Sequence, residues 1–468
     1  MTRPYPDHPQ LRGNFAPIRM ECELPDAVIR GELPRDLNVT YFRNGPDPQF
    51  PPRGAHHWFA GDGMLHRFHI QDGRVSYRNR WLRTVKWKLE HEAGESLFSA
   101  FDPMSNDPRV QGVTTDGLAN TNVVWHGGKL LALEEAHAPF VVDPQTLDSV
   151  GAWTFNGALD GPMTAHPKID PRTGEMLFFG YMADGPFGRM ISYQVVNAAG
   201  ELTRSERFEA PFPSMVHDFI TTDEHVIFPI FPLTGSLERA MKGQPAFAWE
   251  PDKGTHIGIM PRDGTVNDIR WFETDPCYVF HPMNAYTDGN RIVAHVMQFD
   301  EAPLFPHLDG SKPDPDKANA RLTEWEFDLA ANTSTVKRRR LDDISGEFPR
   351  LDERYAGHGY RHGFYAASTS RDGGLGFDAL AHHDFETGRR TLHVLPEGDR
   401  AGEPVFVPRH ESAAEGDGYV LATVYRAAEN RSDLAVFDAA NLADGPVACA
   451  ELPHRVPHGF HGNWKYND

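Results

Sequence analysis

Cysteine is scarce in this sequence. Its 468 residues include three cysteines, Cys22, Cys277 and Cys449, which lie far apart and form no Cys-x-x-Cys pair. Such a set excludes a disulfide framework and a cysteine-based zinc module, and it suits a reducing compartment. We therefore expect a cytoplasmic protein.

Long hydrophobic runs and an excess of basic charge are also missing. The most apolar stretch, residues 226–233, is eight residues long and contains two prolines, so it cannot span a bilayer. The N-terminal residues MTRPYP are polar and lack the apolar core of a signal peptide. The 66 acidic residues outnumber the 46 Lys and Arg residues, and the resulting negative field repels phosphate backbones and anionic lipids. We expect no nucleic-acid partner and no transmembrane segment; the oligomeric state is left open.

Helix signals are few, whereas tight turns recur along the whole chain. One class of turn has Gly-Gly or Asp-Gly at its tip, as at Gly128 and Gly289, and a strand-like segment follows. A second class begins with aspartate, whose side chain can bond the backbone two residues on; its members are Asp143, Asp170, Asp384 and Asp438. The two classes alternate, which is typical of four-stranded blades, so the pattern predicts an all-β fold, a β-propeller. We expect one domain over residues 1–468, with six to eight blades and one short helix at 236–241.

Four of the 24 histidines share a local context. His166, His217, His281 and His461 each lie among apolar or small residues at the edge of a strand-like segment. Their spacings of 51, 64 and 180 residues exclude a zinc finger and an HExxH site, whose ligands are close in sequence. In a propeller, the inner strands of several blades converge on one axis, so residues this far apart can bind one metal.

Several motifs around these histidines make a family recognisable. They are YFRNGP at 41–46, FAGDGML at 59–65, ANTNVV at 119–124, TAHPK at 164–168, EFPR at 347–350, EPVFVP at 403–408 and GFHGNW at 459–464. With these motifs in this order, the chain resembles the carotenoid cleavage oxygenases, most closely their bacterial lignostilbene dioxygenase and isoeugenol monooxygenase branch. The resemblance extends from about Pro34 to Trp464.

The resemblance implies a seven-bladed propeller with a cap of loops and short helices over one axial Fe(II) per chain. The four histidines match the iron ligands, and Glu135, Glu347 and Glu403 match glutamates that bind the second nitrogen of ligand imidazoles. Such carboxylates fix the tautomer of each ligand and balance the charge of the metal. Thr121 matches a small residue beside the sixth coordination position, although it equally fits an ordinary strand threonine.

The activity implied is cleavage of a conjugated C=C bond by dioxygen into two carbonyl products, with no nucleophilic residue involved. In the branch that the chain resembles, a tyrosine and a lysine hold the 4-hydroxyl group of the substrate. Phe101 and Glu134 stand at these positions, so the phenol-binding pair is absent and a phenolate would be repelled. We expect a small hydrophobic alkene of the stilbenoid or phenylpropenoid type, with Phe59, Phe101, Thr121, Glu134 and Phe280 at its pocket.

Three alternatives stay open at this point. The alkene could be an apocarotenoid, or the chain could be a non-catalytic propeller that binds a hydrophobic ligand. A propeller lactonase is a further alternative, but such sites favour carboxylate and amide ligands around a hard cation. The set of four histidines favours the oxygenase.

Overall fold

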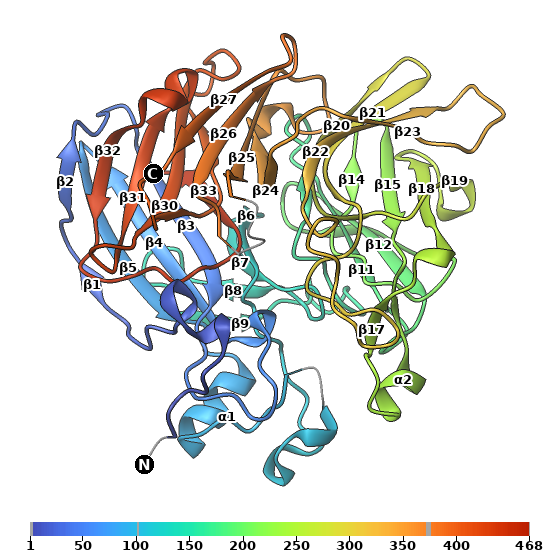
Figure 1. The fold of residues 1–468 in the computed structure, drawn as a ribbon, viewed down its shortest axis with the longest axis horizontal. Coiled ribbons are helices and arrows are strands. Elements are labelled where there is room, and N and C mark those ends of the chain that lie inside the picture. Colours follow the sequence, from blue (N-terminus) through green and yellow to red (C-terminus); the bar gives the residue numbers. More distant parts are fainter. Residues whose placement is uncertain (1–2, 101–102, 371–375, 468) are drawn as a thin grey trace.

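The computed structural model describes residues 3–100, 103–370 and 376–467, and these form a ring of antiparallel sheets (Figure 1). Seven sheets of four to six strands and one two-stranded ribbon are present in these residues. The propeller that the turn pattern predicts, and the seven blades that the resemblance implies, are thereby confirmed. In the same residues, no helix has both the length and the apolar character needed to cross a membrane.

Blades 1 to 4 follow one another around the ring. Blade 1 contains β1 (Glu23–Leu24), β5 (Arg74–Trp81), β4 (Gly63–Gln71), β3 (Val39–Pro46) and β33 (Gly462–Tyr466). Blade 2 contains β6 (Asn122–His126), β7 (Lys129–Leu133), β8 (Phe140–Val142) and β9 (Ser149–Ala152). Blade 3 contains β10 (Lys168–Ile169), β11 (Met176–Tyr181), β12 (Met190–Val196) and β13 (Leu202–Glu209). Blade 4 contains β14 (Ile220–Thr221), β15 (His225–Ile230), β18 (Thr255–Pro261) and β19 (Arg270–Thr274).

Blades 5 to 7 complete the ring. Blade 5 contains β20 (Tyr278–Asp288), β21 (Arg291–Phe299), β22 (Arg321–Asp328) and β23 (Lys337–Arg340). Blade 6 contains β24 (Ser345–Leu351), β25 (His362–Ser368), β26 (Ala379–Asp384) and β27 (Arg389–Val394). Blade 7 contains β2 (Val28–Gly31), β32 (Pro446–Glu451), β31 (Arg431–Asp438), β30 (Gly418–Arg426), β28 (Arg400–Ala401) and β29 (Val405–Pro408).

Short elements lie between the blades. The ribbon is β16 (Leu233–Gly235) with β17 (Phe247–Trp249). The α-helices are α1 (Val85–Ala93), which Thr84 caps, and α2 (Leu237–Met241), which Ser236 caps, close to the predicted 236–241. Both lie on the lower side of the ring in Figure 1. The 3-10 helices are η1 (Pro9–Leu11), η2 (Gly13–Phe15), η3 (Trp58–Ala60), η4 (Pro103–Ser105), η5 (Pro108–Val110), η6 (Pro251–Lys253), η7 (Val266–Asp268), η8 (Glu353–Tyr355) and η9 (Ala439–Asp444).

The aspartate-initiated turns form as the sequence predicts. The Oδ1 atom of Asp143 accepts hydrogen bonds from the amides two and three residues on, and Asp170, Asp384 and Asp438 repeat this arrangement. These turns join neighbouring strands of blades 2, 3, 6 and 7. The Gly-Gly and Asp-Gly turns join the first two strands of blades 2 and 5. The two turn classes are therefore the connections of the repeated blade.

Strands from the two ends of the sequence close the ring. The C-terminal strand β33 pairs with β3, with Val39 opposite Tyr466 and Arg43 opposite Gly462. The N-terminal strand β2 forms the outer edge of blade 7 by pairing with β32. Strand β3 is buried along its whole length, whereas β13 at the outer edge of blade 3 alternates between half-buried and exposed residues. This closure brings His461 to the same place as residues of blades 2 to 5.

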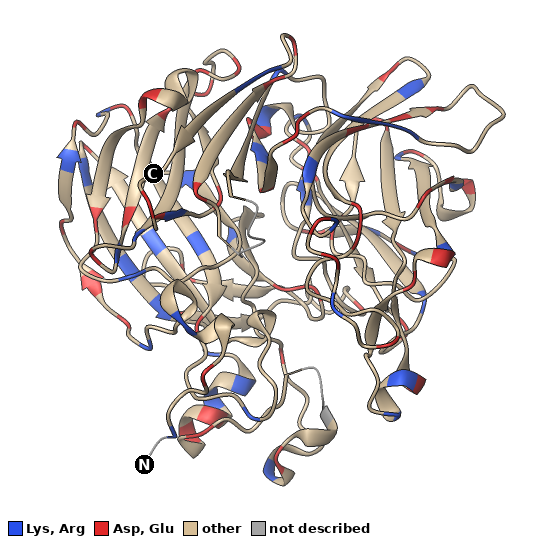
Figure 2. Ribbon diagram, in the orientation of Figure 1, with Lys and Arg blue, Asp and Glu red and all other residues tan. Residues whose placement is uncertain are grey.

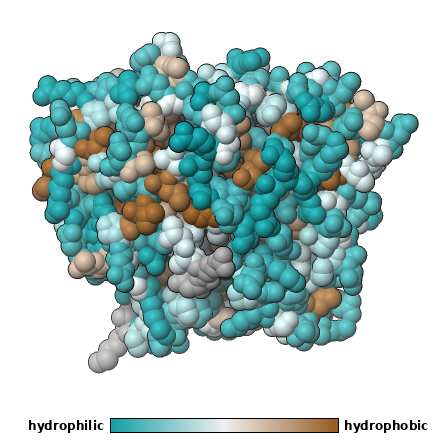
Figure 3. Space-filling model, turned by 45° about the horizontal axis from the view of Figure 1, so that its top comes forward, coloured by the Kyte–Doolittle hydropathy of each residue, from teal (hydrophilic) through white to brown (hydrophobic). Residues whose placement is uncertain are grey.

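The outside of the molecule carries both signs of charge. Figure 2 shows Lys and Arg interleaved with Asp and Glu around the ring rather than gathered in one sector. The face in Figure 3 is mostly hydrophilic, with hydrophobic residues in small groups.

Candidate metal centre

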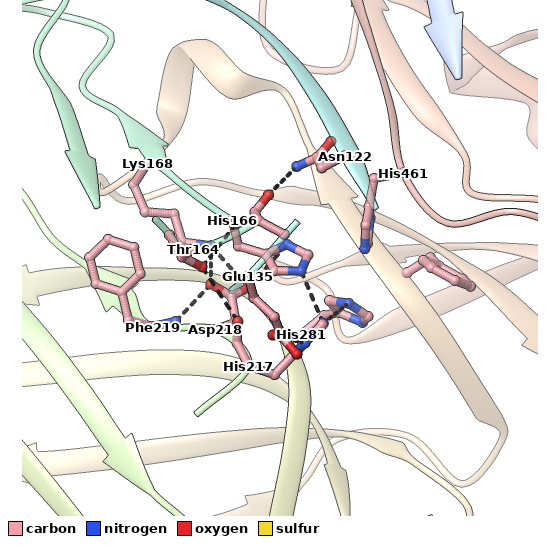
Figure 4. Close-up of polar contacts among 12 residues, drawn as sticks. Asn122, Glu135, Thr164, His166, Lys168, His217, Asp218, Phe219, His281 and His461 are labelled. Carbon is pink, nitrogen blue, oxygen red and sulfur yellow. Dashed lines mark hydrogen bonds and ion pairs between the residues drawn. The ribbon is translucent and has the colours of Figure 1, made fainter. Parts of the chain in front are cut away.

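The four histidines lie at the inner strands of four different blades. His166 precedes β10, His217 precedes β14, His281 lies within β20, and His461 immediately precedes β33. All four are buried, and one nitrogen of each lies within 4.8 Å of one nitrogen of every other. Figure 4 shows these imidazoles gathered at one point although they come from distant parts of the chain.

Their separations suit ligands of one ion. The Nε2 atom of His217 lies 3.0 Å from that of His166 and 3.2 Å from that of His281. An ion about 2.1 Å from each nitrogen puts neighbouring octahedral ligands about 3.0 Å apart. The spacing therefore fits a six-coordinate ion that takes four imidazole nitrogens and keeps two positions open for other ligands.

Three glutamates hold the other ring nitrogens. The Nδ1 atom of His217 lies 2.9 Å from Glu135, that of His281 lies 2.5 Å from Glu347, and that of His461 lies 2.9 Å from Glu403. Each carboxylate accepts a hydrogen bond from Nδ1–H, which leaves Nε2 unprotonated and directed at the point where the four imidazoles meet. The structure thus brings all seven residues singled out in the sequence into one cluster.

Electrostatics keeps most of these imidazoles neutral. Burial lowers the pKa of His166 and His281 well below the usual range, and it lowers the pKa of His461 to about 4. Burial acts in the same direction on His217, but the charge and hydrogen bond of Glu135 outweigh it, so its pKa is raised. A neutral imidazole is the form that binds metal, so the lowered pKa keeps three of the four histidines in the metal-binding form.

The backbone is irregular at the centre. Strand β20 shifts register around His281, and β24 shifts register after Glu347. The next residue, Phe348, has φ of +55°, a left-handed conformation that costs energy for a bulky side chain. Its ring lies against that of His281, with ring centres 5.4 Å apart. The adjacent residues Glu347 and Phe348 thus both contact the same candidate ligand, His281.

Aromatic rings border the centre. Phe280 lies against His217, with ring centres 5.1 Å apart, and Phe59 of η3 packs on Phe280 and on Phe460, the neighbour of His461. The backbone carbonyl of Thr121 accepts a hydrogen bond from the amide of His461, and its hydroxyl group donates to Asn120. Thus Phe59, Phe280 and Thr121 all lie next to candidate ligands.

Phe101 and Glu134 stand where the resemblance leads us to expect a tyrosine and a lysine, and the structure describes one of the two. Phe101 lies outside the described residues. Glu134 is largely buried, and its carboxylate accepts a hydrogen bond from Nδ1 of His137. Burial lowers the pKa of His137, but the charge and hydrogen bond of Glu134 exceed that effect, so the pKa is raised. A carboxylate with an imidazole partner therefore stands where the resemblance leads us to expect the lysine.

Sequence reasoning missed several members of the cluster. Arg350 forms an ion pair with Glu403 (3.2 Å), and Tyr181 donates a hydrogen bond to Glu135 (3.2 Å). Asp218, held by Lys168, faces His166. Arg350 and Lys168 stand in motifs that carry the resemblance, and Asp218 follows the candidate ligand His217, whereas nothing near Tyr181 in the sequence marked it.

A propeller whose axis carries four clustered histidines and three glutamates defines a class of candidate metalloprotein. Residues 15–466 match the sequence model of the retinal pigment epithelial membrane protein family. The chain is 38% identical to isoeugenol monooxygenase from Pseudomonas nitroreducens over 99% of both chains. It is also 38% identical to lignostilbene-alpha,beta-dioxygenase isozyme III from Sphingomonas paucimobilis, covering 98% of this chain and 97% of that one.

Solved structures agree with the sequence matches. The crystal structure of Pseudomonas brassicacearum lignostilbene dioxygenase superposes with a TM-score of 0.95 and 35% identity, and the match covers 100% of both chains. The chain therefore belongs to the carotenoid cleavage oxygenase family, the family of the retinal pigment epithelial membrane protein. It is an oxygenase, as its relatives are.

Proposed function

We propose that this protein is an Fe(II)-dependent dioxygenase that cleaves the conjugated C=C bond of a stilbenoid or phenylpropenoid-type alkene into two carbonyl products. His166, His217, His281 and His461 are the proposed ligands of one iron per chain. The observation that carries the proposal is the set of 3.0 and 3.2 Å separations between Nε2 atoms, combined with a carboxylate on Nδ1 of three of the four rings.

The reaction needs no external reductant. Cleavage of the C=C bond supplies four electrons, which reduce one dioxygen molecule, and each carbon takes one oxygen atom as a carbonyl. Bound Fe(II) supplies the redox-active centre at which dioxygen reacts. The chain itself contributes neutral imidazoles, glutamates that hold their Nδ1 protons, and the Phe59 and Phe280 rings that exclude water and accept an apolar alkene.

Substrate recognition is proposed to differ from that of phenol-binding relatives. A buried carboxylate at Glu134 repels a phenolate and accepts a hydrogen bond, so the alkene either carries no acidic hydroxyl group or presents a donor to this residue. Phe101 is proposed to add an apolar wall. The lack of a lysine at position 134 also favours a second candidate, the cleavage of an apocarotenoid.

Metal analysis of purified protein tests the proposal first. We expect about one iron per chain after anaerobic reconstitution, and loss of bound iron and turnover in His217→Ala, because one ligand and the partner of Glu135 disappear together. Aldehyde products from a panel of stilbenes, phenylpropenes and apocarotenoids under labelled dioxygen would identify the substrate by mass spectrometry.

A matched control separates ligand loss from general damage. His295 is also buried, lies on β21 of blade 5 and contacts Tyr360 rather than the cluster. The His295→Ala variant should keep its iron and its turnover. Full iron content in His217→Ala, or equal loss in both variants, would contradict the ligand assignment.

A further inference from the structure

His166 differs from the other three histidines in the partner of its second nitrogen. In the described residues, no hydrogen bond is formed by the Nδ1 atom of His166, whereas glutamates occupy that atom in His217, His281 and His461. If Nε2 of His166 binds a metal, the proton of the neutral ring must be on Nδ1 and must find an acceptor. The carboxylate nearest to this atom is that of Asp218, whose Oδ2 lies 3.9 Å away.

Asp218 is held firmly in this place. It is 4% exposed, and its Oδ1 accepts a hydrogen bond from the amide of Phe219 (2.7 Å). The Nζ atom of Lys168 contacts both carboxylate oxygens, at 2.8 Å from Oδ1 and 3.1 Å from Oδ2. Figure 4 shows Lys168, Asp218 and His166 side by side. A buried carboxylate is costly without such partners, so the pair with Lys168 stabilises Asp218 beside the ligand.

The pair of Lys168 and Asp218 borders the same cavity as candidate ligands of the metal. His166, Lys168 and Asp218 all line one cavity of about 570 Å³. His281 and His461 line the same cavity. Lys168 and Asp218 therefore border the same cavity as three of the candidate ligands.

The same arrangement occurs at a neighbouring ligand. Glu403 accepts the Nδ1–H of His461 and forms an ion pair with Arg350. Asp218 faces Nδ1 of His166 and forms an ion pair with Lys168. Both are imidazole–carboxylate–cation sets, and they differ in that the distance from imidazole to carboxylate is 1 Å longer at His166.

We propose that Asp218 is the fourth outer carboxylate of the metal centre, a positioning residue that accepts a hydrogen bond from the Nδ1–H of His166, with Lys168 as its anchor. The inference rests on the proposed metal site and deepens it. The cation reduces the charge that Asp218 presents, so its effect on metal affinity falls at the lower end of the 10- to 100-fold range typical of such partners.

The test uses full-length apoprotein and Co²⁺ as the probe. In Asp218→Asn, we expect the Kd for Co²⁺ to rise about tenfold. Proton NMR of the cobalt form should show four strongly shifted imidazole N–H signals in the wild-type protein. In the variant, the N–H proton of His166 should exchange faster with water, so its signal should weaken, while the other three signals persist. A carboxylate restored by Asp218→Glu should recover most of the affinity.

Asp170→Asn is the matched control. Asp170 follows β10, the strand that begins with Lys168, and forms a largely buried pair with Arg262 (2.5 Å), so this variant loses an ion pair that involves none of the four histidines. Its Kd and its four signals should match those of the wild-type protein. If Asp218→Asn does not fold, Lys168→Gln tests the role of Asp218 instead. It removes the cation that holds the Asp218 carboxylate in place, and it should broaden the N–H signal of His166 alone.

Two results would overturn the inference. Wild-type affinity with four protected N–H signals in Asp218→Asn would show that Asp218 does not hold His166. Equal weakening in the Asp170→Asn control would show a general effect of losing an ion pair. By contrast, a wild-type protein that binds no metal would reject the proposed metal centre itself.

Discussion

At the residue scale, two side chains are proposed to give this protein a different substrate from that of relatives that bind a phenol. Glu134 presents a carboxylate bound to His137, and Phe101 has no hydroxyl group. The double variant Phe101→Tyr/Glu134→Lys should raise kcat/KM for 4-hydroxystilbenes about 10- to 100-fold. A hydrogen bond to a charged group is worth about 1.5–3 kcal/mol, which corresponds to that range. Steady-state kinetics with the substrate panel would measure it.

The contribution of the lysine can be separated from the loss of repulsion. Phe101→Tyr/Glu134→Gln removes the negative charge without adding a cation, so it should show only part of the gain. An unchanged kcat/KM in the lysine variant would mean that the pocket differs from that of the relatives at more than these two positions.

The residues of the centre were predictable to different degrees. His166 and His461 lie in recognisable motifs, whereas His217 and His281 share with them only a local context of apolar or small residues, and the structure places all four together. Asp218 and Lys168 could not be predicted, because adjacency in sequence does not reveal that β10 and β14 bring their side chains together. Long-range contacts of this kind depend on how neighbouring blades pack.

At the element scale, the closure of the ring determines where His461 stands. The segment before β33 runs very close to β3: a Cβ atom added at Gly459 would lie 2.7 Å from the carbonyl oxygen of Asn44 and 3.1 Å from the Cα atom of Gly45. Both are backbone atoms, which cannot move aside cheaply. The turn pattern predicted the strands of the blades, but this contact joins strands about 400 residues apart, and no local pattern encodes it.

Gly459→Ala should therefore destabilise the protein by about 1–3 kcal/mol, as overpacking does. It should also weaken Co²⁺ binding, because the segment carrying His461 must shift. Urea unfolding and metal titration would measure the two effects. Gly359→Ala is the control, since nothing lies within 4 Å of its added Cβ atom, and its stability should stay within about 0.5 kcal/mol of the wild-type value. Equal effects of the two substitutions would rule out the close approach as the cause.

At the scale of the whole molecule, 24 histidines make the fold sensitive to acid. The pKa is lowered in fourteen of them, chiefly by burial, and raised in two. His66 of β4 is an example: it is 3% exposed, bonds the hydroxyl group of Tyr77, and burial holds its pKa well below the usual range. Buried carboxyl groups with a raised pKa have the opposite effect on the pH dependence of stability, but they are fewer. Asp47 is one of them, and burial raises its pKa to about 7.

The sign of the pH dependence follows from these shifts. Below about pH 6.5 the unfolded chain takes up protons that the folded histidines refuse, so the free energy of unfolding falls as the pH falls. Each such histidine contributes at most about 1.4 kcal/mol per pH unit. Urea unfolding of the apoprotein at pH 7, 6 and 5 should therefore show a steep loss of stability.

His66→Gln should lower the free energy of unfolding at pH 7, but this free energy should then depend less steeply on pH, by up to one proton. His410→Gln, at an exposed position, should leave the pH dependence unchanged. A slope that is equal in the wild-type protein and in His66→Gln would mean that buried neutral histidines do not govern the acid response.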